Sequence, residues 1–112
     1  MNVVILRGVL SRPAEQRVLP SGDTLIAYEV RTANEPGPAD SVPVVWPAAP
    51  ERALFSEGQA VVVTGRVRRR FYRAAGVTQS RTEVVADAVI RATDVRRVRR
   101  VVEQAVALVA PP

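Results

Sequence analysis

Arginine recurs at every second position along one stretch of the sequence, and an aromatic residue ends the series. The members are Arg66, Arg68, Arg70 and Tyr72. Because side chains alternate between the two faces of a β-strand, all four would share one face. Guanidinium groups bind phosphates through paired hydrogen bonds, and a flat ring stacks on a nucleobase. The spacing therefore predicts a basic strip with an aromatic end, a surface suited to phosphates and exposed rings.

The positive charge is concentrated in one part of the chain. The 112 residues contain 16 arginines, 11 acidic residues and no lysine, which gives a net charge of +5. Residues 66–100 hold eleven arginines and three acidic residues, a net charge of +8, whereas residues 1–65 carry −2. Strongly basic domains favour polyanions such as nucleic acids. The alternative is a solvated basic face that aids solubility, and the scattered Arg7, Arg17 and Arg31 are expected to be such surface charges.

Several classes of chemistry are missing from the sequence. It contains no cysteine and no histidine, which excludes disulfides, zinc sites built on these residues and histidine-based catalytic triads. It has no glycine-rich phosphate-binding loop, and its carboxylates lack metal-ligand spacing. We therefore expect neither an enzyme nor a bound cofactor or metal. Apolar runs are too short to span a bilayer or to form a secretory signal at Met1–Leu10, so we expect a cytoplasmic protein without membrane contact. If its polyanion is DNA, we expect it to be nucleoid-associated.

Short apolar runs separated by turn residues predict an all-β domain. Valine, with 22 copies, dominates these runs, and β-branched residues favour strands. A helix of about one turn is expected at Pro50–Phe55, where proline suits the first turn and Gly58 the stop. Five strands are predicted, at Val3–Leu10, Thr24–Thr32, Ser41–Trp46, Ala60–Tyr72 and Thr82–Ile90.

The C-terminal segment has a different periodicity. Val95, Val98 and Val102 recur at a spacing of three to four residues, which predicts an amphipathic helix over Asp94–Ala110 with Asp94 as its N-cap. The density of β-branched residues favours a further strand instead. The chain is accordingly divided into a folded domain at residues 1–92 and a basic, apolar extension at residues 93–112.

Four segments of the sequence together resemble those of a known protein family. They are Asn2–Leu10 continued by Leu19–Gly22, Ser41–Trp46 (SVPVVW), Glu57–Arg68 (EGQAVVVTGRVR) and Arg81–Asp87 (RTEVVAD). In this order, over residues 2–91, they resemble the bacterial single-stranded DNA-binding protein family. The resemblance implies an OB fold, a five-stranded Greek-key barrel with a short helix between strands three and four. It also implies a homo-oligomer, a tetramer or a dimer, that binds single-stranded DNA in replication, recombination or repair.

The resemblance also implies roles for two rings. Tyr72 falls at a family position that carries a stacking tryptophan, and Trp46 aligns with an aromatic residue on the DNA face of the family. Trp46 shares its strand parity with Val42 and Val44, however, and burial in the core explains that parity equally well. Tyr28 is a further candidate for base stacking, although no sequence motif supports that role.

The long strand and its hairpin supply the remaining candidates. One face of the strand is expected to be core, formed by Val61, Val63 and Val67, and Phe71 has the same parity. Arginines at the two ends of the loop 74–80 are expected to reach phosphates. The full set of expected DNA-binding residues is Trp46, Tyr72, Arg66, Arg68, Arg70, Arg73 and Arg81.

The sequence departs from the family in two respects. Few aromatic residues are present, so affinity is expected to depend on charge and hence on salt. The chain ends Val109-Ala-Pro-Pro112, so the acidic tip with which the family recruits other enzymes is expected to be absent. RNA is an alternative candidate ligand, because stacking and phosphate contacts distinguish the sugars poorly. The alternative function is an oligomerising or protein-binding OB-fold subunit with weak or no DNA binding of its own.

Overall fold

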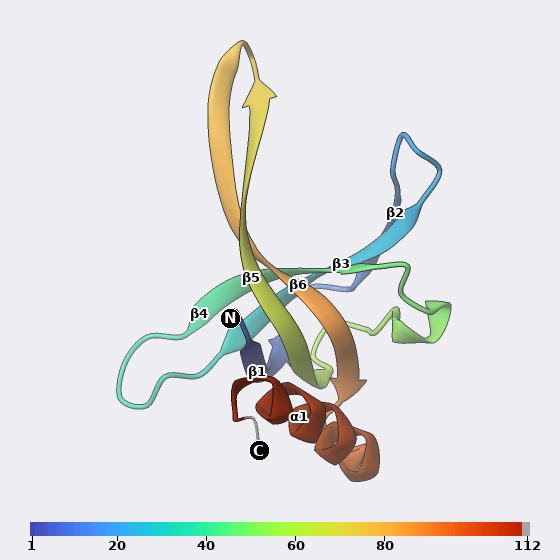
Figure 1. The fold of residues 1–112 in the computed structure, drawn as a ribbon, viewed down its shortest axis with the longest axis vertical. Coiled ribbons are helices and arrows are strands. Elements are labelled where there is room, and N and C mark those ends of the chain that lie inside the picture. Colours follow the sequence, from blue (N-terminus) through green and yellow to red (C-terminus); the bar gives the residue numbers. More distant parts are fainter. Residues whose placement is uncertain (111–112) are drawn as a thin grey trace.

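Six strands form a single, strongly curved sheet, and a helix follows it (Figure 1). The computed structural model describes residues 1–110. The strand order is β1-β5-β6-β4-β3-β2. A further antiparallel pairing joins Val9 and Leu10 of β1 to Arg31 and Val30 of β3, so the sheet closes on itself in a barrel-like form. The elements are β1 (Val4–Leu10), β2 (Glu15–Val18), β3 (Thr24–Thr32), β4 (Asp40–Pro47), β5 (Ala60–Ala74), β6 (Val77–Arg91) and α1 (Val95–Val109).

The core fills the inside of this curved sheet. Its fully buried members come from five strands, which are the ones that close the ring. Close packing requires glycine at position 65, since a Cβ atom on Gly65 would collide with the backbone of Val85 and Ala86. The largest fully buried side chains are Leu10, Ile26, Val30, Val44, Val61, Val63 and Val89.

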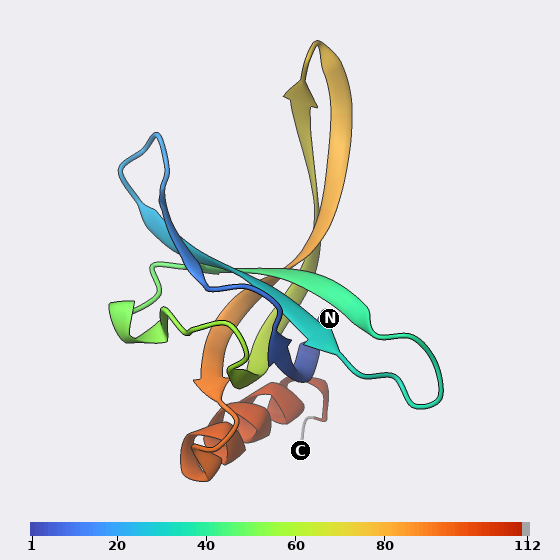
Figure 2. The ribbon, with the colours of Figure 1, turned by 180° about the vertical axis from the view of Figure 1, so that it is seen from behind.

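The C-terminal helix covers the outside of the barrel. The helix expected at Asp94–Ala110 is present as α1, and the Asp94 side chain accepts a hydrogen bond from the Arg97 N–H at 3.3 Å. It packs against β1, β5 and β6, at the end of the barrel opposite the two projecting arms (Figure 2). Ala105 of α1 is buried, and so are Val62 and Ile90, which face each other across β5 and β6. The last two residues of the expected extension, 111–112, lie outside the described residues.

Two expectations about the elements were wrong. Six strands are present rather than five, because Glu15–Val18 pairs with β3 as β2. All four β2 residues are exposed, so the segment lacks the apolar alternation that predicts a strand. The segment Pro50–Phe55 contains only a 3-10 turn at Glu51–Ala53 rather than a helix.

Candidate nucleic-acid interface

Two arms project from the same side of the barrel (Figures 1 and 2). The long arm is the distal part of the β5–β6 hairpin, residues 66–82, where all but one of the residues are exposed. The short arm, residues 15–25, contains β2 and its turn into β3, where the Asp23 carbonyl accepts the Leu19 N–H at 2.8 Å. A groove of about 500 Å³ lies between the arms, and residues from both line it.

Arginines of the long arm converge on one buried carboxylate at the base of this groove. Glu83 is 3% exposed, and its carboxylate lies 2.6 Å from Arg68, 3.6 Å from Arg70 and 3.8 Å from Arg81. The three arginine side chains remain 41–48% exposed. One negative charge therefore holds three guanidinium groups in place, and the cluster keeps two net positive charges that face solvent.

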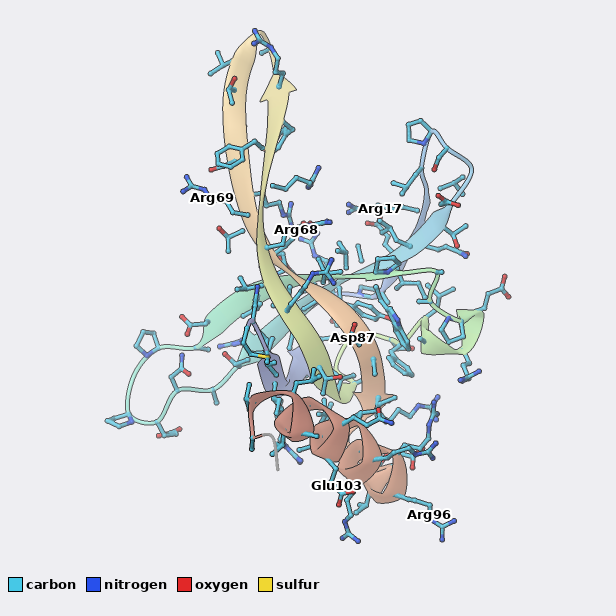
Figure 3. The ribbon with its side chains drawn as sticks, in the orientation of Figure 1. Arg17, Arg68, Arg69, Asp87, Arg96 and Glu103 are labelled. Atoms are coloured by element: carbon cyan, nitrogen blue, oxygen red, sulfur yellow. The ribbon has the colours of Figure 1, made fainter. Side chains whose placement is uncertain are left out.

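The short arm and the segment just before it add cations from the other side of the groove. Arg12 and Arg17 line the groove together with Arg68, and Figure 3 shows Arg17 and Arg68 extending toward the gap between the arms. Arg17 makes an exposed ion pair with Glu15 at 3.2 Å. Arg17 was expected to be a scattered surface charge, and no local pattern joins it to the basic strip, which begins 49 positions later at Arg66.

The floor of the groove is the outer face of β3 and β4. Leu25 and Ala27 alternate with core residues along β3, and Val45 of β4 is the cross-strand partner of Ala27. These three apolar side chains are half-buried and line the groove. Glu29, the next residue on this face of β3, has a buried Oε2 atom to which no group in residues 1–110 donates a hydrogen bond. The floor is thus apolar, with one unpaired acceptor at its end.

An aromatic ring stands above the arginine cluster on the long arm. Tyr72 is 36% exposed, and the Arg70 guanidinium lies 5.3 Å from the centre of its ring. Its hydroxyl donates to Gln79 Oε1 at 3.3 Å across the hairpin. Because Gln79 faces Tyr72 and Arg81 faces Arg70 in the strand register, the ring continues the groove-facing side of the arm. Of the predicted run Arg66, Arg68, Arg70 and Tyr72, the last three therefore share this face of the arm.

The opposite face of the long arm holds a second set of side chains. The Arg69 guanidinium lies 5.2 Å from the centre of the Phe71 ring, and Figure 3 shows Arg69 on the side of the arm away from Arg17. Arg73, expected with the groove set, donates to the Gly76 carbonyl at the hairpin tip. Odd-numbered positions of β5 thus turn away from the groove, and Arg73 is separated from the predicted strip.

The expected core face of β5 ends earlier than the sequence suggested. Phe71 is 66% exposed and Val67 is 43% exposed, so the expectation that both are core was wrong. Beyond Gly65 the hairpin leaves the barrel, and no facing layer remains to cover these positions. The Val67 N–H is instead bound by the side chain of Asn2 at 2.9 Å. Arg66, at the same transition, is exposed but does not line the groove.

Trp46 lies away from the groove. It is half-buried, packs against the barrel core and lines a separate pocket at the end of β4. Its cross-strand partner is the buried Ile26, as its parity with Val44 indicated. Tyr28 is buried, donates to the Ala53 carbonyl at 2.9 Å, and has its pKa raised by desolvation. Tyr28 is among the residues that line the groove, but it is almost fully covered, whereas Trp46 lines the other pocket. Tyr72 is exposed on the long arm, beyond the lining residues of the groove.

Comparison with known proteins adds no assignment. No protein-family model matches the chain, and no curated protein matches it. Within residues 1–110, no helix is long and apolar enough to cross a membrane.

Proposed function

We propose that this protein binds single-stranded nucleic acid, with single-stranded DNA as its ligand, in the groove between the two arms. The observation that carries the proposal is the convergence of guanidinium groups from both arms over an apolar floor. Two come from near the short arm and three from the long arm. A strand of phosphates and unpaired bases complements both parts of such a groove.

Each part of the groove has a distinct role in this proposal. The exposed guanidinium groups of Arg12, Arg17 and the Glu83 cluster neutralise phosphates and release their counterions. Bases pack on Leu25, Ala27 and Val45, and one stacks on Tyr72, a contact that contributes roughly 1–3 kcal/mol per base. A duplex keeps its bases stacked and paired, so it offers this floor no ring faces. The groove accordingly favours single strands without a strong preference for sequence.

The strand topology supports the finer proposal that the barrel is an OB fold of the bacterial single-stranded DNA-binding type. The ring β1-β5-β6-β4-β3 is closed by the β1–β3 pairing. OB folds bind oligonucleotides on one sheet face between two projecting loops, and the groove occupies such a place. On this proposal the protein is a homo-oligomer, a tetramer or a dimer, that protects exposed strands during replication, recombination or repair.

Fluorescence anisotropy of a labelled oligo-dT strand tests this function, with a duplex of equal length as the control. We expect tighter binding of the single strand, with affinity falling as salt rises at a log–log slope of about −0.7 per phosphate contact. Equal affinity for strand and duplex at every salt concentration would contradict the proposal.

A second function is favoured by the apolar surface on the barrel exterior. Ile5 and Val9 of β1 are each 43% exposed, and Leu108 and Val109 of α1 are each 54% exposed. A subunit that oligomerises or binds another protein would cover these side chains. One experiment distinguishes the two functions. A stable oligomer in analytical ultracentrifugation, together with no strand binding at low salt, favours the second function.

A further inference from the structure

A second, smaller pocket lies outside the arm groove and has an unusual lining. Its volume is about 180 Å³. Four parts of the chain meet here: the end of β4, the turn that follows it, the end of β6 and the first turn of α1. Trp46 and Phe55 contribute two half-buried rings, and Arg52, Arg91 and Arg97 contribute three cations. We refer to it as the Trp46 pocket.

The cations of the Trp46 pocket are only partly neutralised from within the protein. Asp94 is the one acidic residue in the lining, and its carboxylate lies 3.8 Å from the Arg97 guanidinium. In the described part of the chain, no carboxylate pairs with Arg52 or Arg91. The pocket thus has a net charge of +2, and this charge favours an anionic occupant.

The rings and cations of the pocket are arranged for a flat anion. The Arg91 guanidinium lies 5.5 Å from the centre of the Phe55 ring, which fixes a cation beside an aromatic wall. Aromatic side chains bind planar rings by offset or edge-to-face packing, and guanidinium groups bind phosphate oxygens in pairs. A volume of about 180 Å³ admits one base-sized ring but not two stacked bases.

We propose that the Trp46 pocket binds one nucleotide, with its base against Trp46 and Phe55 and its phosphate on Arg52 and Arg91. The nucleotide has two possible sources, a free nucleoside monophosphate or one residue of a bound strand. For the second source the inference rests on the proposed function, and for the first source it stands independently. In either case the Trp46 indole acts at a site separate from Tyr72.

Trp46 is the only tryptophan of the chain, so its emission reports this pocket directly. Titration with dTMP is expected to quench the emission saturably, and thymidine, which lacks the phosphate, is expected to bind about fivefold more weakly. Inorganic phosphate is the second reference and should compete with dTMP. Trp46 emission is also measured during a titration with an oligo-dT strand. Binding of that strand is measured independently by fluorescence anisotropy.

A pair of charge-matched variants assigns the quenching to the pocket. Arg52 is exposed and lines the pocket, whereas Arg96 is an exposed arginine of α1 outside it. Arg52→Gln should weaken quenching about fivefold, whereas Arg96→Gln should leave it unchanged. Because neither residue is buried, both variants are expected to fold.

The outcomes distinguish the source of the nucleotide and separate this inference from the proposed function. Quenching by dTMP that Arg52→Gln weakens supports the inference for a free nucleotide, even if no oligo-dT binds. Quenching only by oligo-dT, again weakened by Arg52→Gln, supports it for a nucleotide of a bound strand. Strand binding by anisotropy, with Trp46 emission unchanged by oligo-dT and by dTMP, overturns this inference and leaves the groove proposal intact. The inference is also overturned if none of these probes quenches the Trp46 emission, or if the two variants change the quenching equally.

Discussion

The buried carboxylate of Glu83 accepts a hydrogen bond from the Arg68 guanidinium at 2.6 Å, across the base of the β5–β6 hairpin. Two more arginines, Arg70 and Arg81, lie within 4 Å of the same carboxylate. A charge this deeply buried requires partners, and here the partners are side chains of the proposed DNA contact. Glu83 therefore links the stability of the hairpin base to the position of the groove cations.

Neutralising Glu83 is expected to affect stability and binding in opposite directions. Glu83→Gln removes a charge-assisted hydrogen bond, so the free energy of unfolding should fall by about 1–3 kcal/mol. The variant also releases three guanidinium groups from a competing anion, so oligo-dT affinity at low salt should rise. Denaturant unfolding and anisotropy measure the two effects. Glu15→Gln, which breaks only the exposed pair with Arg17, should cost less than about 1 kcal/mol.

Removing the ring of Tyr72 should weaken strand binding without unfolding the protein. The side chain lies on the exposed arm, so Tyr72→Ala should leave the melting temperature nearly unchanged while oligo-dT binding weakens by about 1–3 kcal/mol. Phe71→Ala is the matched control, because its ring lies on the opposite face of the same strand. If both substitutions weaken binding equally, the groove-facing side of the arm has no special role.

The unpaired Oε2 atom of Glu29 predicts a base preference. Cytosine offers an exocyclic amine as a hydrogen-bond donor to a carboxylate, whereas thymine has no such amine. Because this oxygen is buried, the Glu29 side chain must turn into the groove to accept the amine. Oligo-dC is then expected to bind more tightly than oligo-dT of equal length by about 1 kcal/mol. Competition anisotropy measures the ratio of the two affinities, and Glu29→Gln should reduce it. A ratio of one in the unsubstituted protein would exclude this contact.

Tyr28 predicts a loss of stability at high pH. Burial raises its pKa above the ordinary value of 10.0, so the folded state favours the neutral phenol. The stabilisation is complete below the unfolded-state pKa and is lost as the pH rises through the folded-state pKa. The unfolding free energy should therefore decline above about pH 10. Tyr28→Phe should remove this decline, and it should cost about 1 kcal/mol at neutral pH through the lost bond to Ala53.

Local sequence patterns predicted part of the fold and of the groove. The alternation of Arg68, Arg70 and Tyr72 predicted their common face, because strand geometry alone determines it. The helix over residues 94–110 followed from its apolar spacing and its cap. Strand β2 escaped prediction because its four exposed side chains carry no pattern, and because its pairing with β3 determines its conformation.

The remaining features depend on tertiary structure. Val67 and Phe71 have core parity, but parity does not tell where a hairpin leaves its barrel. Arg12 and Arg17 join the groove because the short arm folds toward the long one, which no local spacing indicates. The sequence left two interpretations of Trp46, burial in the core and stacking on a base. The position of the turn at Glu51–Ala53 places Trp46 in a separate pocket.

The central claim is that a groove between two arms, rather than basic charge in general, binds the strand. The most direct test compares two double variants of equal net charge, Arg12→Gln/Arg17→Gln in the groove and Arg96→Gln/Arg99→Gln on α1, in oligo-dT affinity across a salt series. We predict that the groove variant loses about tenfold in affinity and that its log–log salt slope becomes less steep by about 1.4. The helix variant should stay within about twofold of the unsubstituted protein. Equal losses in the two variants would contradict the account, because they would show that the strand responds only to overall charge.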